Sequence, residues 1–182
     1  MADREEFLRT WYQVLWSNID RSMMSVWQIT GLIVVVGGAF IYRDKLGPNL
    51  TVSLQMIVIF WAINNTIDMN SWHRRNLLFI FRVEQQFLND TDYGRVIPSS
   101  YRGDPPTRWI AFYKINFATF VVLLVAVIAE YVHVLIKTPP ANPCLAIGPL
   151  LVFLAGAAFT GVMCSKAEER IARTKREISE GR

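Results

Sequence analysis

The chain has 182 residues, of which 52% are hydrophobic, 13% aromatic and only 19% charged. A soluble domain of this length usually carries about 25% charged residues. The uncharged residues are grouped into three long stretches, at 22–42, 46–67 and 138–165. Uncharged apolar runs of about 18 or more residues are typical of transmembrane helices. Composition therefore excludes a soluble globular enzyme, a disordered tail and a disulfide scaffold, and it indicates a small polytopic membrane protein.

Residues 1–22 predict a cytoplasmic amphipathic arm. Apolar and aromatic residues recur there at helical spacing, at Leu8, Trp11, Tyr12, Leu15 and Ile19. Such a helix lies either on a membrane surface or a partner, or against its own bundle. The sequence leaves both interpretations open.

The first transmembrane hairpin is expected over residues 23–68. Span one covers about 23–42 and span two about 50–68. The sequence Gly47-Pro48-Asn49 between them is typical of a tight turn. Two spans joined by so short a link form an antiparallel pair.

Residues 69–112 form the cytoplasmic segment between the hairpins. No Gly or Pro occurs between Leu50 and Asn89. Span two is therefore expected to continue as one helix of about 40 residues, near 60 Å long. The alternative is a bend at Asn70-Ser71 that lays the following residues along the membrane. Residues 89–107 are polar and rich in Gly and Pro, which predicts a loop.

The second transmembrane hairpin is expected over residues 113–164. Span three covers about 113–136 and span four about 145–164, joined by a link that contains three prolines. The tail at 165–182 has helical propensity, and Glu169 with Arg173 makes a favourable pair four residues apart. We expect this tail to be a solvated helix end.

The distribution of Lys and Arg predicts the orientation of the spans. Of 19 such residues, only Arg43, Lys45 and Lys137 fall in the two short loops, which leaves 16 elsewhere. Cytoplasmic segments carry the excess of basic residues. Both termini and the middle segment are therefore expected in the cytoplasm, in an all-α, four-span protein of the inner (cytoplasmic) membrane.

Polar residues inside the spans are the main functional lead, because burying them in a membrane costs free energy unless they are paired. Comparison of their depths predicts two layers. The inner polar layer contains Gln28, Asn64, Asn65 and Asp68, and the outer polar layer contains Gln55, Glu130 and His133. The layers either fix helix packing through hydrogen bonds or form two vestibules around an apolar constriction of a pore.

Two further groups of residues are candidate contacts. Trp72, Arg74, Arg75 and Arg82 are expected to bind a partner or lipid phosphates, unless the arginines only enforce topology. Ala157, Gly161 and Ser165 are spaced by four, a pattern that lets helices approach closely, within the chain or between copies.

Catalytic and cofactor signatures do not occur in the sequence. It contains no Gly-rich phosphate loop, no paired-cysteine motif and no nucleophile elbow. We therefore expect no enzymatic activity, no cofactor and no metal. A nucleic-acid partner is not expected either, because no basic-aromatic groove motif accompanies the net charge of +4.

The segment 23–68, followed by Trp72-His73-Arg74-Arg75-Asn76 and by residues 82–88, resembles the SLATT-type membrane effectors of bacterial conflict systems. The resemblance covers the first half of the chain. It implies a protein that forms homo-oligomers and perturbs the membrane when a partner senses infection, in anti-phage defence. The other hypothesis from the sequence is a membrane anchor or scaffold that recruits a cytoplasmic protein.

Overall fold

The computed structural model describes residues 2–39, 47–87, 111–137 and 143–180, apart from the side chains of residues 2–5, 30, 32–37, 39, 85, 87, 111 and 143–146. It contains four long helices, α1 (Ala2–Ala39), α3 (Pro48–Phe87), α4 (Ala111–Lys137) and α5 (Pro143–Ser179). The described part of the chain is therefore all-helical, as the sequence predicts. The predicted loop at 89–107 lies outside the described residues.

Gly47 and Pro48 determine where helix α3 begins, and the helix then runs without a break. Gly47 has a positive φ of 78°, which glycine adopts without strain. Pro48 follows as the first helical residue, where its missing N–H costs no hydrogen bond. The helix then runs for 40 residues, about 60 Å. This confirms the predicted continuous helix and excludes the alternative bend at Asn70-Ser71.

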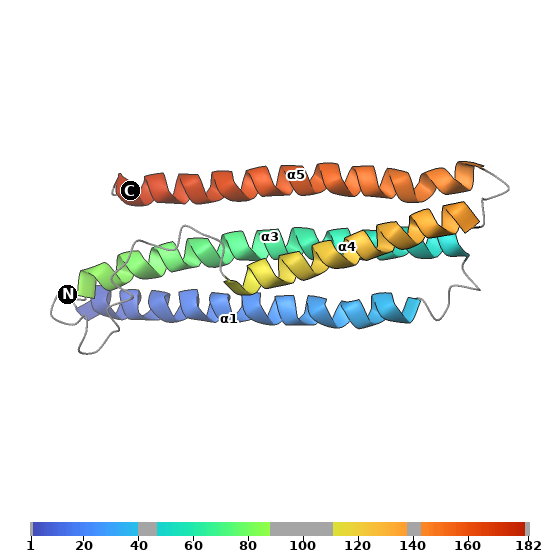
Figure 1. The fold of residues 1–182 in the computed structure, drawn as a ribbon. Helices are drawn as coiled ribbons and strands as arrows, with labels where there is room; N and C mark the ends of the chain where they lie inside the picture. Colours follow the sequence, from blue (N-terminus) through green and yellow to red (C-terminus); the bar gives the residue numbers. More distant parts are fainter. Residues whose placement is uncertain (1, 40–46, 88–110, 138–142, 181–182) are drawn as a thin grey trace.

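Helix α3 is the centre of the fold. Helices α1, α4 and α5 each pack mainly against α3 and make few contacts with one another. Figure 1 shows α1 and α5 on opposite sides of α3, with α4 crossing α3 obliquely. The main core combines α3 residues such as Met56, Ile63 and Ile67 with Phe120 of α4 and Ala167 of α5. The interior of the chain at this level is thus filled by apolar side chains.

The packing differs from two simple hairpins. Helices α1 and α3 are antiparallel neighbours, as expected for the first hairpin (Figure 1). Helix α5 runs parallel to α3 and packs along it, so that α4 and α5 are not a closely packed pair among the described residues. The physical reason is that α3 carries most of the buried polar groups, and three covering helices shield them better than one.

The most apolar helices of this chain are the most exposed ones, which is the opposite of a soluble protein. The most apolar 18-residue window of α3 is 61% buried, whereas those of α4 and α5 are 22% and 6% buried and have higher mean hydropathy. Large apolar side chains of these two helices are exposed, among them Val122, Val125, Leu151 and Phe159. An exposed apolar exterior around a more polar central helix is what a bilayer stabilises.

Among the described residues, three helices are long and apolar enough to cross a membrane: those at Pro48–Glu84, Phe112–Lys137 and Ile147–Ser179. These correspond to the predicted spans two, three and four. Predicted span one includes residues 32–37, whose side chains are not described, and residues 40–42, which lie outside the described residues. Span one therefore remains a prediction. Helix α1 nevertheless continues through this region as far as Ala39.

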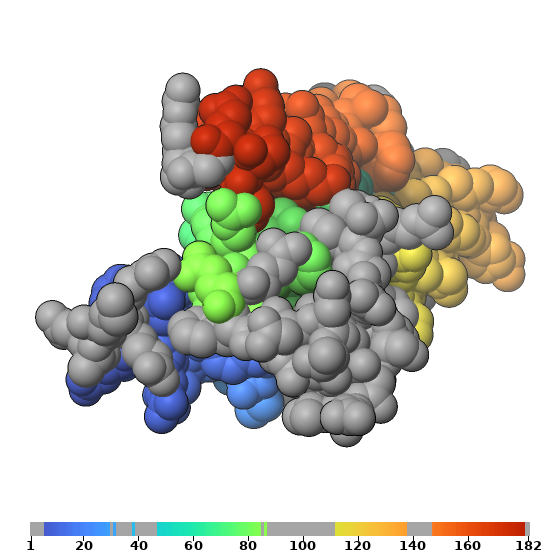
Figure 2. Space-filling model, turned by 90° about the vertical axis from the view of Figure 1, so that its left-hand side faces the viewer, coloured from blue at the N-terminus to red at the C-terminus, as the bar shows by residue number. Residues whose placement is uncertain are grey.

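At one end of the molecule, α1, α3 and α5 extend past the start of α4 (Figure 1). We call this part the stalk and define it as residues 6–24 of α1, 75–87 of α3 and 169–179 of α5. Leu15 and Ile19 of α1 pack there against Ile80 of α3 in a second apolar cluster. Figure 2 views the molecule from the stalk end, with α1 in blue, α3 in green and α5 in red.

The sequence left open whether the N-terminal arm lies on a membrane or partner, or packs against its own bundle. Packing in the stalk answers this for residues 12–23. Leu15 and Ile19 are each only 2% exposed, because α3 covers them. The arm is also continuous with the rest of α1, without a break near residue 22. Over this stretch it packs on its own chain, while Phe7, Trp11 and Trp16 are exposed.

Candidate functional site

Polar contacts concentrate where the stalk meets the apolar part of the helices. We call this level the junction, and define it by Asp68, His73 and Arg74 of α3 with their partners. Arg74 donates a hydrogen bond from Nη1 to Oε1 of Glu168 at 2.9 Å. Arg170 donates to Oδ1 of Asp68 at 2.5 Å. Two ion pairs thus join α3 to α5.

A third contact of the junction joins α3 to α4. Nδ1 of His73 lies 3.2 Å from the hydroxyl oxygen of Tyr113, and the two rings meet edge to face with centroids 5.5 Å apart. Tyr113 is completely buried and His73 is 8% exposed. Trp27 of α1 contacts Phe112 of α4 nearby, with centroids 5.8 Å apart. All four helices therefore meet at or next to the junction.

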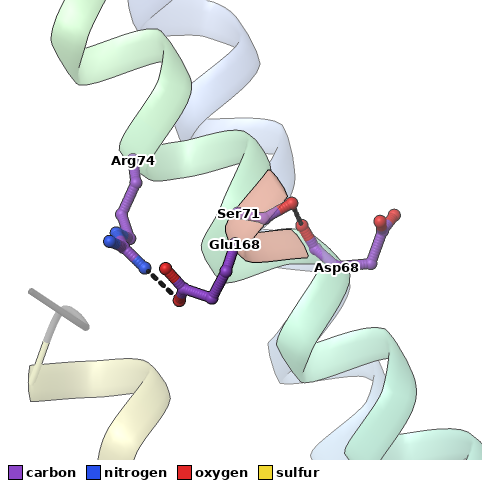
Figure 3. Close-up of polar contacts among 4 residues, drawn as sticks. All are labelled: Asp68, Ser71, Arg74 and Glu168. Atoms are coloured by element: carbon purple, nitrogen blue, oxygen red, sulfur yellow. Dashed lines mark hydrogen bonds and ion pairs between the residues drawn. The ribbon is translucent and has the colours of Figure 1, made fainter. Parts of the chain in front are cut away.

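The Arg74–Glu168 pair is electrostatically asymmetric. The Arg74 side chain is 4% exposed, whereas the Glu168 side chain is 61% exposed. Figure 3 shows Arg74 and Glu168 reaching toward each other from α3 and α5, with Ser71 donating to the backbone carbonyl of Asp68. A buried cation loses more hydration than an exposed carboxylate, so it depends more strongly on its partner.

A small cavity of about 240 Å³ lies beside this ion pair, between α3 and α5. It is lined by polar and apolar residues, including Asn70, Ser71, Cys164 and Ala167. Space of this size next to charged groups holds water readily.

The predicted partner or lipid contacts separate onto two faces of α3. Arg74 is 3% exposed and paired with α5, so in this structure it faces the molecule's interior and not a lipid or partner. Trp72 and Arg82 are exposed. The guanidinium carbon of Arg75 lies 5.1 Å from the Trp72 ring centroid and 5.9 Å from that of Phe79. Only Trp72, Arg75 and Arg82 remain candidates for such contacts.

Within the stalk, Tyr12 of α1 donates a hydrogen bond to Oε1 of Glu84 of α3 at 2.9 Å. Desolvation raises the pKa of Tyr12 above its usual value, and the nearby Glu84 carboxylate adds to the increase. A raised tyrosine pKa keeps the hydroxyl protonated over the physiological range. Tyr12 is therefore a permanent donor that links the arm to α3.

The inner polar layer is not a single cluster. Asp68 belongs to the junction, but Asn64 donates to the backbone carbonyl of Phe60 on its own helix at 2.8 Å. Asn65 is half-buried and Gln28 is exposed. The structure thus places Gln28 on the outside of the chain, away from the buried members of the layer. The sequence pattern alone did not indicate which face of its helix each of these residues occupies.

The outer polar layer is also not joined by hydrogen bonds within the described residues. Gln55 is 1% exposed, and neither its Nε2 nor its Oε1 has a hydrogen-bond partner there. Glu130 is half-buried and His133 is exposed on α4. A buried amide without partners is unusual, since nearly all buried polar groups are bonded.

The small residues that the sequence indicated for close packing face outward within the chain. Ala157, Gly161 and Ser165 are exposed, and nothing lies within 4 Å of a methyl group added at Gly161. Helices α3 and α5 approach each other closely at Gly156, the residue before Ala157. An added Cβ at Gly156 would overlap the ring of Phe60. Of the two alternatives for this stripe, packing within the chain is therefore wrong.

Sequence reasoning missed three residues of the junction: Glu168, Arg170 and Tyr113. The tail was expected to be a solvated helix, and its predicted pair is present, with Arg173 3.6 Å from Glu169. Glu168 and Arg170 lie on either side of the buried face of α5 and reach α3. The signal that would have found them is Ile171, which lies on the same face and is 2% exposed.

Among the described residues, no group of three or more His, Cys, Asp or Glu side chains is arranged to hold a metal ion. The chemistry that the junction supports is exchange of ion pairs and hydrogen bonds between helices. Comparison of the chain with known proteins finds no match among family models, curated proteins or solved structures.

Proposed function

We propose that this chain is a non-enzymatic inner-membrane protein that acts as an oligomeric membrane effector, in which the stalk controls the packing of the spans. The observation that carries the proposal is the single 40-residue helix α3. Residues 75–87 of α3 form the stalk with α1 and α5, and the longer remaining part of α3 lies at the centre of the apolar helices. A contact at the stalk is transmitted along a rigid helix because no hinge interrupts it.

In this proposal the membrane is perturbed between copies of the chain. The interior of one chain contains an apolar core that α3, α4 and α5 share. Gln28 on α1 and His133 on α4 are exposed within or near the apolar part. Polar residues in spans almost always face a protein interior or water. Neighbouring copies are what would shield them from lipid.

The orientation in this proposal has both termini and the stalk in the cytoplasm. It is supported by the 16 basic residues outside the two short loops. The test is labelling of single cysteines introduced at Ser179 and Asn142 in intact cells. An impermeant thiol reagent should label the cysteine at position 142 and not the one at 179. The opposite pattern would reverse the orientation.

The effector proposal is tested by ion flux through liposomes that contain the purified chain. We expect flux that depends on protein concentration more steeply than linearly, and a change in ion selectivity for Glu130→Gln. The matched control is Thr119→Val, which alters an exposed polar residue of α4 whose hydroxyl already bonds its own helix. Absence of flux at all protein densities would contradict the effector proposal.

A second candidate function is a membrane anchor for a cytoplasmic partner protein, and the exposed surface of the stalk favours it. Trp72, Arg75 and Arg82 place aromatic and cationic groups along one helix. Trp and Arg dominate the binding energy of many protein interfaces. In this case the liposomes would show no flux, and the double substitution Trp72→Ala with Arg82→Gln would abolish co-purification of the partner without affecting insertion.

A further inference from the structure

A cavity of about 280 Å³ lies between α1 and α3, at the base of the stalk. Its α1 wall contains Asn18, Arg21, Ser22 and Ser25, and its α3 wall contains Trp72 and Asn76. It is on a different face of α3 from the cavity beside Arg74, which lies against α5. Neither the junction nor the proposed effector function uses this cavity.

The walls of the cavity carry hydrogen-bonding groups that suit an anion. Arg21 is exposed and forms no ion pair among the described residues. Ser22 and Ser25 already donate to backbone carbonyls, at 2.8 and 3.0 Å. Their protons are therefore engaged, and the donors that remain are the side-chain N–H groups of Arg21, of the two asparagines and of Trp72.

Asn76 is the second and independent observation that points to a ligand. It is only 7% exposed and lines the cavity, so the cavity is where its amide N–H can reach an acceptor. Amides at buried positions are almost always bonded to protein, water or a ligand. The cavity beside Asn76 has room for such a ligand.

The position of the cavity indicates where that ligand comes from. The uncharged run of α1 begins at Ser22, and Met24 and Trp27, which follow it, are 61% and 59% exposed. Met69 also lines the cavity. Polar groups next to an exposed apolar and tryptophan surface are typical of the headgroup level of a bilayer. The cavity thus faces the depth at which lipid phosphates lie.

We propose that this cavity binds the phosphate of an anionic glycerophospholipid headgroup. Arg21 supplies a charge-assisted pair to the phosphate oxygens, for which the guanidinium fork is well matched. Asn76 donates its amide N–H, and the acyl chains lie along Met24 and Trp27. The bound lipid joins α1 to α3 where the stalk begins. The inference requires only that the chain lies in a bilayer and is independent of the proposed effector function.

The test is titration of the full-length chain in detergent micelles with phosphatidylglycerol, followed by the midpoint of thermal unfolding. We expect saturable stabilisation, because a ligand that binds only the folded state raises that midpoint. Arg21→Gln and Asn76→Leu should each weaken the apparent affinity about tenfold, as expected for loss of a hydrogen bond to a charged group. Asn76→Leu changes no charge, so it isolates the specific contact.

Two matched controls distinguish specific binding in the cavity from general electrostatic attraction between the anionic lipid and the basic chain. Arg176→Gln removes one exposed arginine of α5 outside the cavity, and Gln28→Leu removes one exposed amide of α1. Both should change the affinity less than twofold. Equal losses for Arg21→Gln and Arg176→Gln, with none for Asn76→Leu, would show nonspecific attraction and overturn the proposal. A titration with free glycerol phosphate forms a second arm. Equal protection by this soluble compound would also overturn assignment to a lipid.

Discussion

Gly156→Leu should detach α5 from α3 and lower the free energy of unfolding by about 3 kcal/mol, which is the upper range for overpacking a tight contact. Gly156 lies against the ring of Phe60, and any Cβ at this position would overlap ring atoms. Phe60 cannot rotate away freely, because it is 7% exposed and packs against Phe153 at a centroid distance of 5.9 Å. Among the described helices, α3 is the one with which α5 makes its main contacts.

Gly161 provides the control for this substitution on the same helix. Nothing lies within 4 Å of a methyl group added there. Gly161→Ala should therefore be neutral within the chain or stabilise it slightly, because alanine favours the helix by about 1 kcal/mol over glycine. Unfolding in mixed micelles measures both variants, and Phe60→Ala should restore part of the stability of Gly156→Leu. Equal stability of Gly156→Leu and Gly161→Ala would contradict the packing described here.

Glu168→Gln should destabilise the junction more than removal of its partner does, although both variants break the same ion pair. Without the Glu168 carboxylate, the buried Arg74 keeps its charge in an environment that is 4% exposed. Leaving a buried charge without its counter-ion costs about 2 kcal/mol or more. Arg74→Met instead leaves a carboxylate that is 61% exposed and well hydrated. The double variant should therefore be more stable than Glu168→Gln alone.

The neighbouring Glu169 is a matched control, because it makes the same kind of pair at the surface. Glu169 and Arg173 are 65% and 69% exposed and lie 3.6 Å apart. Exposed pairs contribute about 0–1 kcal/mol, so Glu169→Gln should have little effect. The measurement is the unfolding midpoint at two salt concentrations, with the Glu169 variant alone losing its small effect at high salt. A similar loss for both glutamates would indicate that Arg74 is hydrated.

Helix lengths were predictable from the sequence because they depend on local features. The absence of Gly and Pro between Leu50 and Asn89 was enough to predict α3 over its full length. The face that each helix buries was harder to predict. Helix α5 is apolar all round over its first half, so nothing in its pattern distinguishes Gly156 from Gly161.

Long-range charge pairing was the least predictable feature of the site. Arg74 and Arg75 are adjacent and chemically identical, yet Arg74 is buried against α5 and Arg75 is half-buried over two aromatic rings. Successive residues of a helix point about 100° apart, and which of them faces a partner depends on where α5 docks. Glu168 and Glu169 show the same ambiguity on the other helix.

The docking of α5 on α3 has a consequence for how the chain is made. The two ion pairs of the junction join residues separated by 94 and 102 positions. At about 5–20 residues per second, roughly 5–20 s of synthesis separate the two halves of each pair. During that interval α1 and α3 are already made, whereas Asp68 and Arg74 await their α5 partners. Assembly therefore has an ordered step, in which α5 inserts beside α3 after α1 and α3 have been made and supplies the partners of Asp68 and Arg74. An aborted chain that lacks α5 would present these charges to the insertion machinery and to quality-control proteases.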